Sequence, residues 1–199
     1  MFTPPPIPGW DALHPIIIHF PIALLLIAPI LLLLGIILPK QGRGLLIAAF
    51  VVMALGTIAT YFAVDTGEAA AELAERTPGV AAVLERHEEM AETTRAIFTA
   101  LTVVFAGILF VPSLFKRNLG RKSAVVVNLA FLVFYTAGAI VLANVGYEGG
   151  RLVHEYGVHA MTGSNQSFVC RRANGCCNGP LNGANGTPTQ PPTRSGWTR

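Results

Sequence analysis

Four long apolar segments limit most strongly what this chain can fold into. A transmembrane helix needs about 20 consecutive apolar residues to cross the hydrocarbon core of a bilayer, and each segment reaches that length. Only 13% of the residues are charged, about half the share found in an average soluble protein. We therefore predict an all-α integral membrane protein, a bundle of four helices. The predicted spans are residues 15–38, 44–64, 96–115 and 123–145.

The distribution of basic residues predicts the orientation of these spans. Short loops on the cytoplasmic side carry an excess of Lys and Arg. The first connection contains Lys40 and Arg43, and the third contains four basic residues, whereas residues 1–14 contain none. In the second connection eight carboxylates outnumber three arginines. We therefore expect both termini and the second connection on the extracytoplasmic side.

The second connection is predicted to extend two of the spans beyond the bilayer. Residues 65–76 are mostly strong helix formers, Thr77-Pro78-Gly79 is a turn signal, and residues 80–95 again favour a helix. We expect a helical hairpin on the extracytoplasmic side. One face of its second arm carries His87 together with small and apolar residues at a spacing of three and four, while most glutamates lie on other faces. His87 should therefore point into the protein.

Composition predicts the remaining parts of the chain. Residues 1–13 are rich in proline and should form an extended arm, and residues 14–163 form the membrane domain. The glycine-rich stretch 146–150 is expected to end the fourth helix, followed by a short surface helix over Arg151–Met161. Residues 164–199 contain almost no aliphatic side chains, so we expect a tail that is disordered or ordered only by a partner. We detect no internal repeat.

The histidines suggest a cofactor site. All of them lie on the predicted extracytoplasmic side: His14, His19, His87, His154 and His159. A histidine at the rim of a bilayer is costly to desolvate and marks a functional site by default. Helical bundles hold cofactors between inward side chains, and imidazole binds haem iron and divalent metals. We expect a b-type haem between two of these rings, first His19 with His87, then His14 and His154, for electron transfer within a membrane complex.

Two alternatives to haem stay open. A divalent metal could occupy the same region, with His14, His19, Glu68 and His87 as ligands and Asp65 as a group that orients a ring. Each histidine could instead be structural or solvated. In that case the protein would bind no cofactor and would serve as an accessory subunit, docked to a larger membrane assembly through its tail.

Other motifs argue against several functions. The spacing of Cys170, Cys176 and Cys177 matches neither a c-type haem attachment nor a usual zinc site, and one disulfide with one free thiol is the simplest arrangement outside the cytoplasm. No phosphate-binding loop or nucleophile elbow is present, which favours a binding role over an enzymatic one. The predicted spans contain no Asp or Glu that could pass a proton or ion across the membrane, which argues against a transporter. The expected partners are the bilayer and other membrane or redox subunits, and no nucleic acid.

Several motifs together resemble a known family. They are H-P-I-I-I-H-F-P-I-A-L at 14–24, D-T-G-E-A at 65–69, His87-Glu88, and G-G-R-L-V-H-E-Y-G-V at 149–158. Over residues 10–160 the chain resembles the bacterial DUF2231 family. The resemblance implies a four-helix domain in the bacterial inner membrane, and relatives joined to Rieske-type or cytochrome c-type domains imply membrane electron transfer. The matching positions are His14, His19, His87 and the region of His154, although many members carry a histidine near Tyr156 instead.

Overall fold

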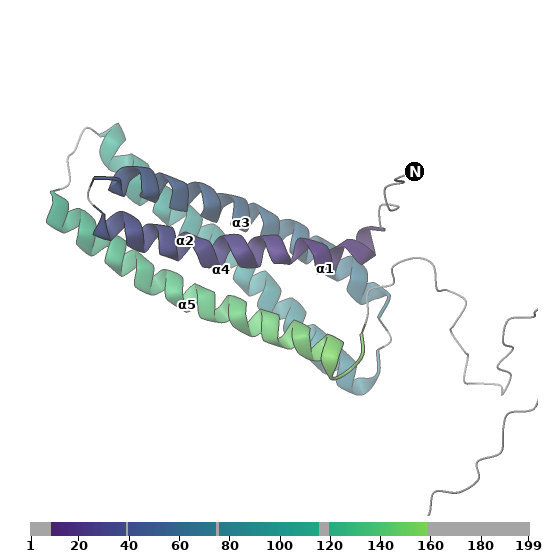
Figure 1. The fold of residues 1–199 in the computed structure, drawn as a ribbon. Helices are drawn as coiled ribbons and strands as arrows, with labels where there is room; N and C mark the ends of the chain where they lie inside the picture. The colour runs from purple at the N-terminus through teal and green to yellow at the C-terminus, as the bar shows by residue number, and fades with distance from the viewer. Residues whose placement is uncertain (1–8, 39, 75, 116–119, 159–199) are drawn as a thin grey trace, which may run out of the picture. The chain divides into compact units, whose positions relative to one another are not determined.

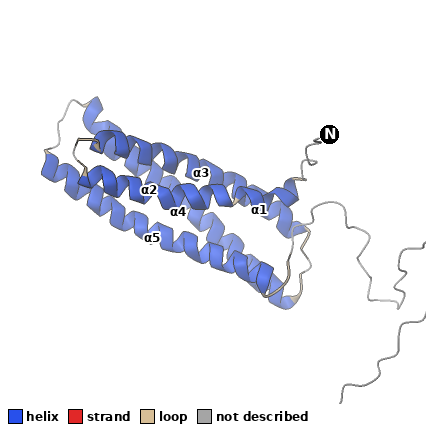
Figure 2. Cartoon of the chain, in the orientation of Figure 1, coloured by secondary structure: helices blue, strands red, loops and turns tan. Residues whose placement is uncertain are grey.

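Helices make up almost all of the chain that a computed structural model describes, which is residues 9–38, 40–74, 76–115 and 120–158 (Figures 1 and 2). These residues belong to one structural unit, Met1–Ser164, and contain no strand. The prediction of an all-α bundle is confirmed. The elements are a 3₁₀ turn η1 (Trp10–Leu13) and the helices α1 (His14–Ile17), α2 (His19–Ile37), α3 (Gly42–Glu72), α4 (Pro78–Leu114) and α5 (Arg121–His154).

The four long helices form a ring in chain order. Each contacts the next, α5 closes the ring against α2, and the diagonal pairs α2–α4 and α3–α5 make no such contact. The short helix α1 continues the line of α2 and packs on α3 (Figure 1). We call the end that carries α1, the end of α3, the start of α4 and the end of α5 the histidine end. The opposite end holds the connections from α2 to α3 and from α4 to α5.

The outer surface of the ring is apolar. Large side chains such as Phe20, Ile30, Leu55, Val133 and Phe134 are exposed. A surface of this kind would promote aggregation in water but suits contact with lipid. Four helices among the described residues are long and apolar enough to cross a bilayer, and they agree with the four predicted spans: His14–Ile37, Gly42–Glu72, Pro78–Pro112 and Arg121–His154. The chain is therefore a membrane protein, and which end faces the cytoplasm stays a prediction.

Aromatic rings fill the middle of the bundle between α4 and α5. Phe105 and Phe131 stack with their centroids 4.7 Å apart, and Phe98 meets Tyr135 edge-on at 5.4 Å. All four rings are buried, together with Leu25 of α2. Such offset and edge-on pairs are favoured over face-to-face stacking and add specificity to the packing.

A proline inside α2 is accommodated by α5. Pro29 has no N–H for the carbonyl four residues earlier, which belongs to Leu25. The hydroxyl of Tyr135 donates to that carbonyl oxygen at 2.7 Å. The helix continues through the proline because a neighbouring helix supplies the missing donor.

The predicted helical hairpin is confirmed at the histidine end. Both α3 and α4 continue well beyond their apolar segments, and the turn between them follows Glu72 and precedes Pro78. The predicted inner face of α4 is buried at Val80, Val83 and Leu84, which pack in a second apolar cluster with Leu152 of α5.

The prediction for the fourth helix was wrong. No break occurs at 146–150, and α5 runs without interruption to His154, so no separate helix begins at Arg151. Glycine inside a helix costs only about 1 kcal/mol relative to alanine, and tertiary packing of this segment outweighs it. The helix is followed by Gly157, which has a φ of 66° and provides the left-handed position that favours glycine after a helix.

Some predictions fall outside the described residues. They concern residues 1–8 of the arm, His159, the tail 164–199 and the three cysteines in it, Cys170, Cys176 and Cys177.

Candidate functional site

His14, the first residue of α1, reaches across to α3. Its Nδ1 lies 2.9 Å from the carbonyl oxygen of Ala63 and 3.3 Å from Oγ1 of Thr66. A carbonyl oxygen can only accept a hydrogen bond, so Nδ1 carries the proton. The Thr66 hydroxyl donates its own proton to the carbonyl of Phe62 at 2.7 Å, so its oxygen can accept from the same ring.

Gly67 makes room for this ring. A Cβ atom added to Gly67 would lie 3.0 Å from Cε1 and 3.2 Å from Nδ1 of His14. Any side chain at this position would therefore push against the imidazole. The glycine in the D-T-G-E-A motif has a steric role in holding His14.

His87 of α4 is held on α5 in the same way. Its Nδ1 lies 3.1 Å from the carbonyl oxygen of Val145, and a Cβ added to Gly149 would lie 3.0 Å from its Cε1. Again the carbonyl requires the proton on Nδ1.

The two arrangements follow one rule. In each, the accepting carbonyl belongs to the residue four positions before the glycine, so both lie on one face of the helix. We call each set an imidazole clamp: His14 with Ala63 and Gly67, and His87 with Val145 and Gly149. Both clamps fix the tautomer in which Nε2 keeps its lone pair. Within the part of the chain that the structure describes, neither Nε2 atom takes part in a hydrogen bond.

The structure brings the two clamped rings to the same end of the bundle. His14 begins the helical line of α1 and α2, and His87 belongs to α4, which lies diagonally across the ring from α2. The two rings thus come from helices on opposite sides of the ring of helices.

Beside His87 lies a buried carboxylate, Glu148, which was not predicted from the sequence. Glu148 is only 5% exposed and is within electrostatic range of the ring. Its Oε2 accepts from Nη1 of Arg151 at 2.9 Å, and its Oε1 lies 3.5 Å from Nε of Arg86. A charged residue next to Gly149 in an apolar helix was the available signal, because such a residue is rarely buried without a partner.

The remaining predicted site residues are exposed. His19 lies on the surface of α2, Asp65 and Glu68 on that of α3, and His154 at the end of α5. Among the described residues no group of three or more His, Cys, Asp or Glu side chains is placed to hold a metal ion. The haem and metal ligand sets stay predictions.

Two hollows between helices have no histidine in their described lining. One, of about 350 Å³, is at the opposite end between α4 and α5. The other, of about 720 Å³, is an open groove on α3 and α4 beside Tyr61 and Arg95. The Arg95 guanidinium lies 5.3 Å from the centroid of the Tyr61 ring, and the Tyr61 hydroxyl is 3.1 Å from Oγ1 of Thr99.

Comparison with known proteins agrees with this architecture. No curated protein and no solved structure matches the chain. A family model described as "Predicted membrane protein (DUF2231)" matches residues 10–162, a range that includes the four long helices and both imidazole clamps. The chain therefore belongs to the DUF2231 family of predicted membrane proteins.

Proposed function

We propose that this protein binds one b-type haem between His14 and His87 and transfers electrons within the membrane. The observation that carries the proposal is the pair of imidazole clamps at one end of the bundle. The sequence predicted His19 as the partner of His87. We choose His14 instead, because the His19 side chain is exposed and His14 is held against α3.

The clamps suit metal ligation. A histidine that binds a metal through one ring nitrogen usually donates the other N–H to a carbonyl or carboxylate, which fixes the orientation of the ring. Ala63 and Val145 provide such carbonyls. A haem with two imidazole ligands has no open position for oxygen and supplies a one-electron couple.

Other residues of α4 and α5 support a cofactor at this end. Thr94 lies two turns after His87 on the same face, is 3% exposed, and its hydroxyl has no hydrogen-bond partner among the described residues. Glu148 places a negative charge near His87, and a carboxylate near a ligating imidazole raises its basicity as a ligand. These groups would tune the site rather than ligate the iron.

We also propose that the histidine end faces the extracytoplasmic side of a bacterial inner membrane. The basic residues of the first and third connections are at the opposite end, which supports this orientation. The electron donor or acceptor would then be a membrane or extracytoplasmic redox subunit.

The test is the visible spectrum of the protein purified in detergent from a haem-replete host. We expect a Soret band of a six-coordinate, low-spin haem, and its loss or conversion to a high-spin form in His14→Ala and His87→Ala. The matched controls are His19→Ala and His154→Ala, because both side chains are exposed. These two variants should keep the wild-type spectrum.

Other outcomes separate the alternatives. Loss of the band in His19→Ala but not in His14→Ala would identify His19, and not His14, as the ligand. A colourless protein that carries a stoichiometric divalent ion by elemental analysis would indicate a metal site. A colourless, metal-free protein that copurifies with a larger complex would indicate an accessory subunit.

A further inference from the structure

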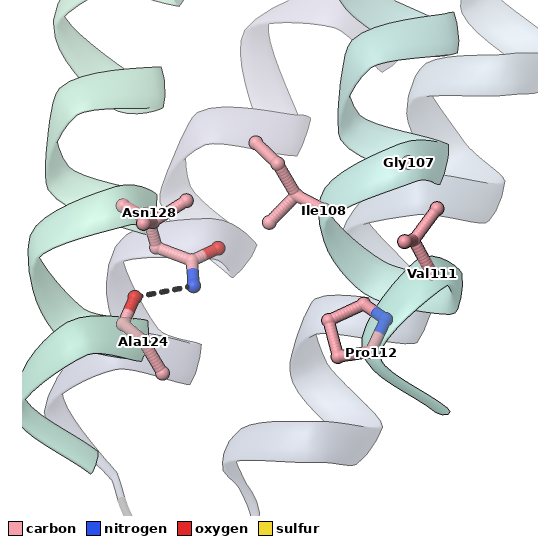
Figure 3. A pocket seen from close by; sticks show the side chains of 7 residues that line it. Gly107, Ile108, Val111, Pro112, Ala124 and Asn128 are labelled. Carbon is pink, nitrogen blue, oxygen red and sulfur yellow. Dashed lines mark hydrogen bonds between the residues drawn. The ribbon is translucent and has the colours of Figure 1, made fainter. Parts of the chain in front are cut away.

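A cavity lies between α4 and α5 (Figure 3). It is at the end of the bundle opposite the histidine end. Its volume of about 350 Å³ falls in the range of small-molecule sites. The lining is aliphatic except for one polar side chain, that of Asn128. What this amide presents to the cavity decides which ligand the cavity can take.

Asn128 directs an unpaired acceptor toward the cavity, while one of the two N–H groups of its amide is used within α5. Its Nδ2 donates to the carbonyl oxygen of Ala124 at 2.7 Å, which fixes the orientation of the amide. Its Oδ1 is therefore directed the other way, toward Ile108 of α4 (Figure 3). Asn128 is 6% exposed, and Oδ1 is buried with no hydrogen-bond donor among the described residues. A buried acceptor without a donor is destabilising unless a ligand supplies one.

The α4 side of the cavity contains a proline. Pro112 lines the cavity and has no N–H for the carbonyl of Ile108, four residues earlier, which lines it as well. Among the polar side-chain atoms of the described lining, Oδ1 of Asn128 is the one without a hydrogen-bond partner. The complementary ligand is a donor with an apolar body.

The depth of the cavity points to a lipid. Asn128 lies five residues inside the apolar segment 123–145, and Pro112 lies three residues inside 96–115. At 1.5 Å per residue these are depths of roughly 8 and 5 Å. A group bound here sits just below the headgroups, where a water-soluble ligand is rare.

We propose that this cavity binds the hydroxyl group of a neutral membrane lipid, as found in a quinol or a diacylglycerol. The O–H donates to Oδ1 of Asn128, and the rest of the molecule packs on the aliphatic lining. An oxidised quinone or a fully esterified glycerol has no O–H and loses this bond. The site is separate from the imidazole clamps and does not depend on haem.

The experiment is a binding titration of the full-length protein in nanodiscs of phosphatidylcholine, which lacks a hydroxyl donor. The side-chain amide signals of ¹⁵N-asparagine-labelled protein report on binding, and Asn128→Leu assigns the relevant signal. The probes form two pairs: a decyl-substituted quinol with its quinone, and dioctanoylglycerol with its acetylated triester. We expect the hydroxyl member of at least one pair to bind about tenfold tighter.

The variants isolate the amide and the cavity. Asn128→Leu keeps the volume but removes the acceptor, so it should abolish the preference for the hydroxyl member. Asn144→Leu is the matched control, because Asn144 also donates to a carbonyl one turn earlier on α5, at 2.9 Å, but is exposed outside the cavity. Gly107→Leu should fill the cavity and block binding, since no atom lies within 4 Å of a Cβ at this position.

Each outcome is decisive. Preference within the quinol pair alone identifies a quinol site, preference within the glyceride pair alone identifies a diacylglycerol site, and both together show that the hydroxyl is what is recognised. Equal affinity within both pairs, a preference that survives Asn128→Leu, or no binding of any probe overturns the proposal.

Discussion

The hydroxyl of Tyr135 on α5 lies 2.7 Å from the carbonyl oxygen of Leu25 on α2, the carbonyl that Pro29 leaves without its helical donor. Both side chains are among the most deeply buried of the described residues. The contact therefore closes the ring of helices at the point where α2 would otherwise expose an unpaired backbone group to an apolar interior.

Replacing Tyr135 with Phe should lower the free energy of unfolding in detergent by about 1–2 kcal/mol, because the Leu25 carbonyl loses its donor. In a Pro29→Ala background the residue at position 29 supplies the helical N–H again. The same Tyr135→Phe change should then cost less, with a coupling of about 1 kcal/mol in the double-mutant cycle. Equal losses in both backgrounds would show that the two positions are independent.

The glycines of α5 provide a matched pair. Gly149→Ala places a Cβ 3.0 Å from Cε1 of His87, whereas a Cβ at Gly146 meets nothing within 4 Å. Alanine gains about 1 kcal/mol of helix propensity at either site, and overpacking costs roughly 1–3 kcal/mol at the first. Thermal unfolding should therefore show Gly146→Ala as stabilising and Gly149→Ala as neutral to destabilising. A stabilised Gly149→Ala would argue against a tight clamp.

Gly67→Ala repeats the test at the other clamp, where the added Cβ would lie 3.0 Å from Cε1 of His14. If the proposed haem is bound, this change should weaken or broaden its Soret band without removing a ligand. If Gly67→Ala keeps the wild-type spectrum while His14→Ala loses the band, the His14 ring has room to shift away from the added Cβ.

Two glutamates that both bind Arg151 differ in burial. The Glu148 side chain is buried, and its Oε2 lies 2.9 Å from Nη1 of Arg151. The Glu155 side chain is 52% exposed, and its Oε2 lies 3.0 Å from Nε of Arg151. Glu148→Gln should lower stability by about 1–2 kcal/mol, because a buried charge-assisted bond is lost and Arg86 also loses its partner. Glu155→Gln should change stability by less than about 0.5 kcal/mol, as is typical of exposed pairs. Reversed magnitudes in thermal unfolding would contradict this account.

Orientation can be tested with single cysteines in a variant whose three native cysteines are serine. A cysteine at Arg76, in the connection between α3 and α4, should react with a membrane-impermeant maleimide in intact cells. A cysteine at Gln41, between α2 and α3, should react only after the membrane is opened. The opposite pattern would place the histidine end in the cytoplasm.

The fold was predictable because its main signals are local. The lengths of the apolar runs indicated the four spans, and the signal Thr77-Pro78-Gly79 indicated the hairpin, although Pro78 and Gly79 are the first two residues of α4 and the connection precedes them. The failure at 146–150 has a physical cause: the helix propensity of Gly149 is poor, but the position is needed for contact with His87, 62 positions earlier in the chain. A contact of that range leaves no periodic trace in a single sequence.

The candidate site was predictable only in part. The sequence indicated that the candidate site is made of histidines and that these lie at the end of the bundle away from the basic connections. It also predicted that His87 lies on an inner face of its helix. The exposure of His19 was overlooked although the spacing indicates it: Ile18 keeps helical φ and ψ, and five residues at about 100° each turn His19 by about 140° away from the face that carries His14. Nor did the sequence reveal that Ala63 and Val145 would serve as acceptors, since every residue has a backbone carbonyl.

The imidazole clamps divide the protein in a way that the sequence does not show. The acceptor and the glycine that contact His14 belong to α3, before the connection to α4, and those that contact His87 belong to α5, after it. Each half thus contains the acceptor and the glycine that contact its own ring. Two fragments severed at that connection and produced together carry all the parts needed to rebuild the arrangement by complementation.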